Sequence, residues 1–177
     1  MPVRVRDADP DRDAAACAAI YAPYVADSVI SFEYEAPSEA EMRRRIDAAH
    51  VWLLAESEGR PFGYAYGSAH AARSAYRWAA DVAIYIDSDH HRAGAGRALY
   101  TELFDRLRDI GLWTLCAGVT QPNEASNGLH LAMGFVPVGT YRRIGWKQGA
   151  WHDVSWFQLD LHPGEPGPPA ELDEAAG

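Results

Sequence analysis

The segment DHHRAGAGRALY, residues 89–100, combines two closely spaced glycines with charged and imidazole side chains. It follows the apolar run DVAIYI and opens a stretch with helical spacing. Glycine in the first turn of a helix loses more backbone entropy than alanine, so a pair of glycines there indicates a close approach to the backbone. The first N–H groups of a helix lack intrahelical partners and bind anions. Gly94 and Gly96 therefore indicate a phosphate site, although a tight strand-to-helix turn would also place glycines here.

Two common phosphate-binding motifs do not fit this segment. A P-loop requires lysine and then serine or threonine after its last glycine, whereas Gly96 is followed by Arg97 and Ala98. A dinucleotide-binding fingerprint requires a third glycine or alanine and an early parallel βαβ unit. The half of the chain before this segment is predicted to be mostly antiparallel, which argues against both nucleotide classes.

Side chains of metal-ligand type surround the same segment. They are Asp87, Asp89, His90 and His91. Carboxylate and imidazole groups also cap helices, and no other part of the sequence has metal-ligand spacing, so we expect no metal. Cys17 and Cys116 lie far apart in apolar settings, which favours two buried thiols over a disulfide.

The elements that must position these groups follow from periodicity and capping signals. A chain of 177 residues is long enough for one domain with a real core. Asp9 and Pro10 predict the start of a first helix, and Ser38 with Glu41 predicts a capping box that opens a second. The predicted order is a strand at 3–6, helices at 10–25 and 38–49, a hairpin at 51–69, a strand at 81–86, a helix that ends at Gly111, a strand at 113–119, a short helix within 121–134, and strands at 135–144 and 151–161. We expect residues 1–162 to form the domain and the proline-, glycine- and acid-rich residues 163–177 to be a disordered tail.

The charge balance limits the partners. The chain has 16 Lys+Arg against 25 Asp+Glu, a net charge of −9. This argues against a nucleic-acid surface, which depends on cations that neutralise phosphates. No stretch is long enough to span a membrane, and the start of the chain lacks the apolar segment of a signal peptide, so we expect a cytoplasmic protein without membrane partners.

A further pattern fits the glycine segment and its surroundings. The acyl-CoA pyrophosphate loop of the GNAT superfamily has the pattern Q/R-x-x-G-x-G/A between a strand and a helix, and residues 91–96 match it except that His91 replaces Gln or Arg. The order of elements across residues 3–161 also resembles this superfamily. Within it the chain resembles the phosphinothricin and methionine sulfoximine/sulfone N-acetyltransferases. The stretches that carry this resemblance are SVISFEYEAPS, ARSAYRWAAD, IYIDSDHHRAGAGRALY, PNEASNGLHLAMGF and GWKQGAWHDVSWFQLD. The resemblance implies a single-domain α/β fold with a mixed, mostly antiparallel sheet flanked by helices.

The resemblance also implies how acetyl-CoA would bind. Backbone N–H groups would hold the pyrophosphate, with the Arg92 and Arg97 side chains adding charge; the loop residues are Arg92, Ala93, Gly94, Ala95, Gly96 and Arg97. The strand residues Ile84, Tyr85 and Ile86 would pair with the pantetheine amides and offer an N–H to the thioester carbonyl. Asn123 matches a position that contacts the CoA arm, although asparagine there can equally cap the next helix.

Catalytic and acceptor positions follow in the same way. Asp81 lies where the family carries a glutamate as general base; because aspartate is one methylene shorter, proton transfer through water becomes favoured. His130 lies where many relatives carry a tyrosine that protonates the departing thiolate, and an imidazole suits acid or base work. Phe32, Arg73 and Tyr76 match positions that line the acceptor pocket. Arg73, with Arg77 nearby, could bind an acidic head group.

These inferences predict an acetyl-CoA-dependent N-acetyltransferase for the primary amine of a small amino-acid-like acceptor. We also expect a homodimer, because the last strands carry many large aromatic residues: Trp146, Trp151, Trp156 and Phe157. The alternatives are an acetyltransferase for another amine, such as a polyamine or an antibiotic, and a non-catalytic acyl-CoA binding module.

Overall fold

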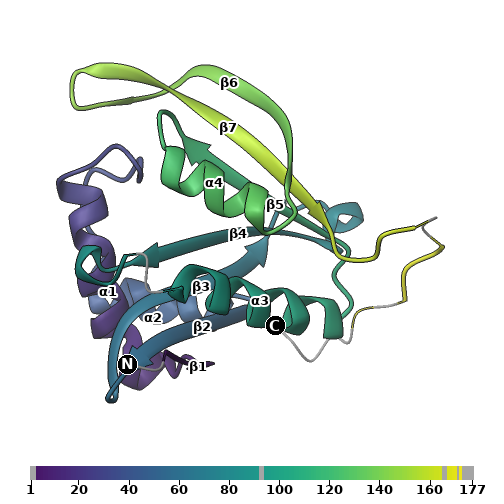
Figure 1. Cartoon of the computed structure of the whole chain (residues 1–177), viewed down its shortest axis with the longest axis horizontal. Coiled ribbons are helices and arrows are strands. Elements are labelled where there is room, and N and C mark those ends of the chain that lie inside the picture. Colours follow the sequence, from purple (N-terminus) through teal and green to yellow (C-terminus); the bar gives the residue numbers. More distant parts are fainter. Residues whose placement is uncertain (1–2, 92–93, 165–166, 171, 173–177) are drawn as a thin grey trace.

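The computed structural model describes residues 3–91, 94–164, 167–170 and 172 (Figure 1). Its elements in chain order are β1 (Arg4–Asp7), α1 (Pro10–Ala26), α2 (Glu39–Ala48), β2 (Val51–Ser57), β3 (Arg60–Ala69), the 3-10 turn η1 (Ser74–Tyr76), β4 (Ala79–Ile86), the 3-10 turn η2 (Ser88–His90), α3 (Ala95–Asp109), β5 (Thr114–Thr120), α4 (Glu124–Ala132), β6 (Val136–Lys147) and β7 (Ala150–Asp160).

All strands form one sheet in the order β1-β2-β3-β4-β5-β7-β6. Every neighbouring pair is antiparallel except β4 and β5, which run parallel. The β4–β5 ladder joins only residues 79–81 to residues 114–116, and past this point the two strands are no longer paired. The predicted mixed, mostly antiparallel α/β fold is confirmed, and its one parallel pair is open over most of its length.

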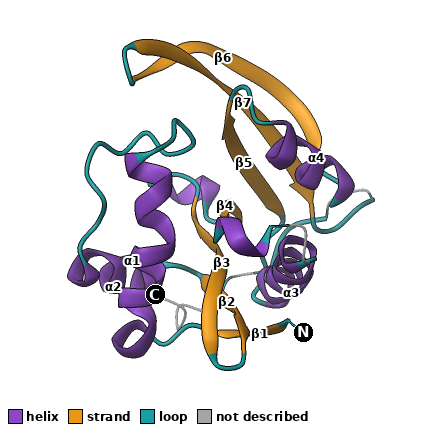
Figure 2. Ribbon diagram, turned by 60° about the vertical axis from the view of Figure 1, so that its left-hand side comes forward, coloured by secondary structure: helices purple, strands orange, loops and turns teal. Residues whose placement is uncertain are grey.

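The helices cover both faces of the sheet. Figure 2 shows α1 and α2 on one side and α3 with α4 on the other. Leu99, Leu103 and Leu107 of α3 are fully buried in one core cluster, and Cys17 and Met42 of α1 and α2 lie in the second. Because side chains alternate along a strand, β4 directs even-numbered residues toward α3 and odd-numbered residues toward α1.

The local signals for the helices act as the sequence predicts. Asp9 accepts hydrogen bonds from the N–H groups of Asp11 and Arg12 at the start of α1. Ser38 accepts from the Glu41 N–H at the start of α2, but the Glu41 carboxylate contacts arginines of its own helix. Only half of the predicted capping box is therefore formed.

Part of the final segment contacts the domain. The Trp78 indole donates to the Ala170 carbonyl at 3.0 Å, and Leu172 packs against the core cluster beneath α3. Residues 165–166, 171 and 173–177 lie outside the described residues, so the disordered tail stays a prediction. Within the described part of the chain, no helix combines the length and apolar character needed to cross a membrane.

Candidate active site

The divergence of β4 and β5 creates a pocket in the middle of the sheet. It is lined by the open parts of both strands, by α3 and α4, and by the loop after α1: Ile30, Val82, Ala83, Ile84, Tyr85, Tyr100, Gly118, Val119, Thr120, Asn123, Ser126 and His130. The predicted cofactor residues Ile84, Tyr85 and Asn123 and the predicted catalytic residue His130 therefore share one pocket.

The backbone of β4 faces this pocket with alternate residues. The Asp87 N–H donates to the Phe62 carbonyl beside β3, so the alternate residue Tyr85 also directs its backbone groups to β3. Ile84 and Ile86 direct theirs to the open side. The Ile86 carbonyl already accepts a hydrogen bond from the Tyr24 hydroxyl at 2.5 Å. Ile84 is thus the residue of the predicted three whose backbone best suits an extended ligand.

The two glycines at the start of α3 differ in purpose. Gly94 has φ +78° at the N-cap, a left-handed conformation that favours glycine, and a Cβ there would meet no described atom within 4 Å. A Cβ on Gly96 would lie 3.1 Å from Leu129 of α4. The interpretation that both glycines clear a path for phosphate therefore needs correction, since Gly96 allows α3 to pack against α4.

The N-terminus of α3 has N–H groups of the kind that bind anions. The first intrahelical bond is donated by Ala98 to the Gly94 carbonyl, so the preceding N–H groups of Ala95, Gly96 and Arg97 have no partner within the helix. The Arg97 side chain is exposed. Arg92 and Ala93 lie outside the described residues, and their predicted role stays a prediction.

Asn123 has the capping role that the sequence left open. Its Oδ1 accepts from the Ser126 N–H at 3.1 Å and caps α4. Because Asn123 also lines the pocket, its cap leaves the contact with the CoA arm as a compatible prediction.

His130 is buried with both ring nitrogens engaged. A carbonyl oxygen can only accept, so Nδ1 carries a proton and donates to the Ser126 carbonyl at 2.8 Å. In the neutral ring Nε2 then accepts from the Tyr100 hydroxyl at 3.0 Å. Burial lowers the pKa of His130, which favours this neutral form. The hydroxyl of Tyr100, which the sequence analysis did not identify, is therefore the proton-bearing group of this pair.

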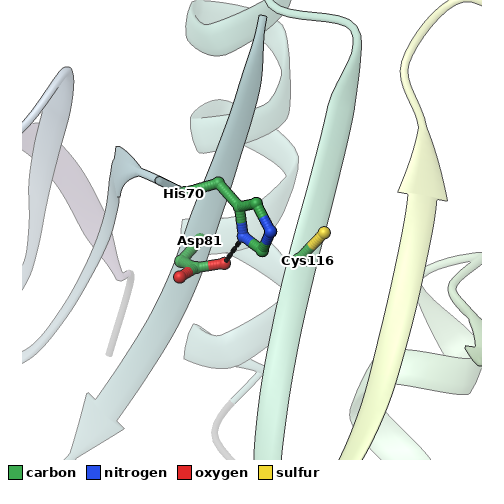
Figure 3. Close-up of side chains that lie close together, drawn as sticks. All are labelled: His70, Asp81 and Cys116. Atoms are coloured by element: carbon green, nitrogen blue, oxygen red, sulfur yellow. Dashed lines mark hydrogen bonds and ion pairs between the residues drawn. The ribbon is translucent and has the colours of Figure 1, made fainter. Parts of the chain in front are cut away.

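Asp81 lies at the last rung of the β4–β5 ladder, opposite Cys116. Its Oδ1 is 2.6 Å from Nδ1 of His70, which follows β3 (Figure 3). Burial raises the pKa of Asp81, and the hydrogen bond to His70 opposes this rise. His70 was not among the residues predicted from the sequence, but the register of β3 and β4 offers a signal: Ala69 pairs with Ala80, so His70 falls opposite Ala79 and lies diagonally across from Asp81 on the same face.

Ligand-type atoms of His70, Asp81 and Cys116 lie within 4.8 Å of one another. Burial raises the pKa of the Cys116 thiol, which disfavours the thiolate that metals bind. Cys116 is half-buried, whereas the sequence suggested that both cysteines are buried. In the ligand-type cluster of residues 87–91, Asp87 Oδ1 accepts a hydrogen bond from the Asp89 N–H, which is a capping role of the kind expected there.

The predicted acceptor residues lie in different settings. Tyr76 is 47% exposed, and its ring centroid is 5.7 Å from that of His70. Arg73 is exposed immediately before η1. The Arg77 guanidinium lies 4.0 Å from the centre of the Trp78 ring, a cation–π contact. Tyr76 is thus the acceptor candidate with a described contact to the pair formed by His70 and Asp81.

Phe32 comes from the loop between α1 and α2, which a buried lysine fixes in place. Lys147 Nζ donates to the carbonyls of Val25 and Ser31 at 2.6 and 2.7 Å. The Phe32 ring approaches Gly145 so closely that a Cβ there would clash with it. Lys147 is a further residue that the sequence analysis missed, since lysine is rarely buried.

A strand edge opened beside a helix N-terminus, with a carboxylate and imidazoles around the opening, suits an extended ligand that carries phosphates and a reactive acyl group. An acyl-transfer protein needs a site of this kind. Residues 8–156 match the family described as "Acetyltransferase (GNAT) domain". The chain belongs to this family of acetyltransferase enzymes.

Individual relatives agree with this assignment. A phosphinothricin N-acetyltransferase of Streptomyces viridochromogenes is 36% identical over 171 residues, which cover 94% of this chain and 93% of the relative. An L-methionine sulfoximine/L-methionine sulfone acetyltransferase of Salmonella typhimurium is 31% identical over 62% of this chain and 64% of the relative. The crystal structure of a phosphinothricin acetyltransferase from Sinorhizobium meliloti in complex with AcCoA superposes with a TM-score of 0.91 and 33% identity, covering 97% of this chain and 95% of the other.

Proposed function

We propose that this acetyltransferase transfers the acetyl group of acetyl-CoA to the primary amine of a small amino-acid-like acceptor of the phosphinothricin or methionine sulfoximine type. The observation that carries the proposal is the pocket between β4 and β5, which is lined by Ile84 and by Tyr100 of α3 and opens where the β4–β5 ladder ends at Asp81. The relatives named above supply the acceptor class.

The residues fit the donor in three places. The N–H groups of Ala95, Gly96 and Arg97 would bind the pyrophosphate, and the left-handed Gly94 keeps side-chain atoms away from it. The open edge of β4 at Ile84 would pair with the pantetheine arm. An N–H on this edge would also stabilise the negative charge that develops on the thioester oxygen.

The reaction also requires a group that takes up a proton and a group that stabilises the departing thiolate. The ammonium group of the acceptor must lose a proton before its nitrogen attacks the thioester carbon, and Asp81 with its partner His70 would take that proton, directly or through water. The carbon–sulfur bond then breaks. Tyr100 lines the same pocket, and its hydroxyl would stabilise the departing thiolate by turning its single proton from His130 Nε2 toward the sulfur.

The acceptor's acidic group would be bound on the side of η1. Arg73 is exposed there, next to Tyr76. Replacing Arg73 with alanine should raise KM for amino-acid analogues far more than for simple alkyl amines, because only the former carry a carboxylate. Equal effects on both kinds of amine would show that Arg73 does not bind the acidic group of the acceptor.

The test of the activity is release of free CoA thiol from acetyl-CoA across a panel of amines. The panel includes phosphinothricin, methionine sulfone, methionine sulfoximine, a polyamine and an aminoglycoside. We expect turnover with the amino-acid analogues. Turnover with the other amines alone would change the acceptor class, and acetyl-CoA binding without turnover on any amine would indicate a binding module.

We also propose a homodimer formed through the β6–β7 hairpin. This edge of the sheet exposes large apolar side chains: Val136, Val138, Tyr141, Ile144, Trp146 and Trp151. Phe157 and Trp156 were also expected to contribute to the dimer face. Phe157 is instead buried in the core, and Trp156 packs over Gly118. Light scattering at micromolar concentration should give the mass of two chains, and a monomer would contradict the proposal.

A further inference from the structure

The pair formed by His70 and Asp81 has a defined orientation. A carboxylate accepts hydrogen bonds, so at 2.6 Å the Nδ1 of His70 donates its proton to Asp81 Oδ1. The neutral ring then has its lone pair on Nε2. Figure 3 shows this second nitrogen pointing away from Asp81, toward Cys116 on β5.

The ring of His70 is also fixed by its neighbours. It meets the Tyr76 ring at a centroid distance of 5.7 Å and an angle of 65°, and the Trp156 ring at 6.4 Å and 88°. The titratable side chains around it are Asp81 of β4, Tyr76 of η1 and Cys116 of β5. The His70 side chain keeps 30% of its surface exposed, so a small molecule can reach it.

We propose that His70 accepts the proton of the acceptor's ammonium group, and that Asp81 positions the ring. The inference rests on the proposed acetyltransferase function. Nε2 of His70 takes one proton, and the freed amine lone pair forms the new bond to the thioester carbon. The CoA sulfur leaves with the electron pair of the broken carbon–sulfur bond, and the second proton lost by the amine nitrogen goes to this thiolate. The Asp81 carboxylate stabilises the resulting imidazolium. The histidine also supplies the reach that aspartate lacks relative to glutamate.

The first experiment compares single variants by steady-state kinetics. His70→Asn retains an N–H that can donate to Asp81 but removes the base, so kcat should fall about 10²-fold while KM for acetyl-CoA stays unchanged. His70→Ala should regain part of its activity when free imidazole is added. The matched control is His162→Gln, because His162 contacts Trp113 and the Leu112 carbonyl, away from the proposed base.

Two further measurements separate this role from others. Cys116→Ala and treatment with EDTA should leave kcat unchanged; a loss with either would mean that the three ligand-type residues act through a metal. In nitrogen NMR spectra His70 should carry its proton on Nδ1, and Asp81→Asn should shift it toward the Nε2 tautomer. A purely structural histidine would show this tautomer change without the effect on kcat.

The outcomes distinguish the inference from the function on which it rests. Absence of thiol release by the wild-type enzyme with every amine would contradict the acetyltransferase proposal itself. Wild-type turnover with a His70→Asn variant within about threefold of it would overturn the role of His70 alone. In that case the base would be Asp81 acting directly or through water.

Discussion

Asp13 of α1 and Asp81 of β4 are two aspartates that differ in burial and in the direction of their pKa shifts. Asp13 is only 3% exposed, whereas the side chain of Asp81 keeps 38% of its surface accessible. Yet the more buried carboxylate has its pKa lowered, and the more accessible one has its pKa raised. Burial alone would raise both, so the difference comes from their partners.

The partners of Asp13 are permanent donors. Against the effect of burial, its pKa is lowered by hydrogen bonds from the Arg6 guanidinium at 2.6 and 2.9 Å and from the Asp9 N–H at 2.8 Å. Arg6 also donates to Glu56 of β2 at 2.7 Å, so the cluster joins β1, β2 and α1. The adjoining cavity of about 400 Å³ is lined by charges that already pair with one another.

Asp81 has a single described side-chain partner, His70, whose charge depends on its protonation state. A carboxylate with all its partners supplied stabilises the fold but has no capacity to take part in proton transfer. A carboxylate with one exchangeable partner contributes little to stability and remains able to exchange protons. The comparison thus separates a structural charge from a reactive one, and four variants test it.

The largest effect is expected for Asp13→Asn. Removing one partner from a buried ion pair should lower the free energy of unfolding by about 3–5 kcal/mol, because Arg6 loses its main counter-charge. Denaturant unfolding at pH 7 measures this change, and kcat of the folded fraction should be unchanged. The control is Asp11→Asn, on the exposed face of the same helix, with a change of less than about 0.5 kcal/mol.

Acid pH should reduce the difference in free energy of unfolding between the wild type and Asp13→Asn. The folded-state pKa of Asp13 is depressed, so its contribution is present above the ordinary aspartate pKa and is lost as the pH falls below it. The two unfolding curves should therefore approach each other below about pH 4. A constant difference down to pH 2 would show that lost packing, rather than charge, dominates.

Asp81→Asn should change activity and leave stability almost unaffected, which is the reverse of Asp13→Asn. We expect kcat to fall about 10²-fold, equivalent to about 2.7 kcal/mol, with unchanged affinity for acetyl-CoA. The free energy of unfolding at pH 7 should change by less than about 1 kcal/mol, since the fold raises the pKa of Asp81 and so does not favour its charge. A large loss of stability with activity retained would make Asp81 a structural charge like Asp13.

Asp81→Glu is the conservative counterpart. A longer carboxylate can still accept from His70 and extends further toward the amine, so most of the rate should be kept. Thiol-release kinetics of both variants with one amine decide the point. If both variants are near wild type, the rate would come mainly from substrate positioning.

Much of the fold follows from local signals in the sequence, because capping residues and apolar periodicity act over a few positions. The start of α1 at Pro10 and the left-handed Gly111 after α3 were both predictable in this way. The divergence of β4 and β5 has no such local signal. It depends on contacts between distant segments, which no local pattern encodes.

The candidate site was predictable in part. Ile84, Asn123 and His130 line one pocket, and Asp81 lies where the β4–β5 ladder ends beside it, whereas their roles stay predictions. His70 and Tyr100 were missed because their partners lie 11 and 30 residues away along the chain. Such pairs arise from strand register and helix packing, and a search for short motifs cannot find them.

The two glycines at the start of α3 differ in the same way as the two aspartates. Gly94 lies at the proposed phosphate site, whereas Gly96 serves the packing of α3 against α4. Gly94→Val should weaken acetyl-CoA binding about tenfold or more, because a branched side chain would enter the space next to the helix N-terminus. Gly96→Ala should instead lower stability by about 1 kcal/mol through its contact with Leu129, while the free N–H groups keep their affinity. Calorimetry and thermal unfolding of both variants measure these effects, and unchanged affinity in a folded Gly94→Val protein would contradict the phosphate site.

The smallest effect is expected for replacement of His130, whose burial favours the neutral ring. Burial lowers its pKa, so as the pH falls through the ordinary histidine range the unfolded chain binds a proton before the folded protein does. Stability must then decrease with falling pH, by at most about 1.4 kcal/mol per pH unit for one group. His130→Asn removes this term, so its free energy of unfolding should depend less steeply on pH between 7.5 and 5.5 than that of the wild type. Equal slopes would mean that His130 gains its proton as readily in the folded protein as in the unfolded chain, and His130 could then donate a proton to the thiolate in place of the Tyr100 hydroxyl.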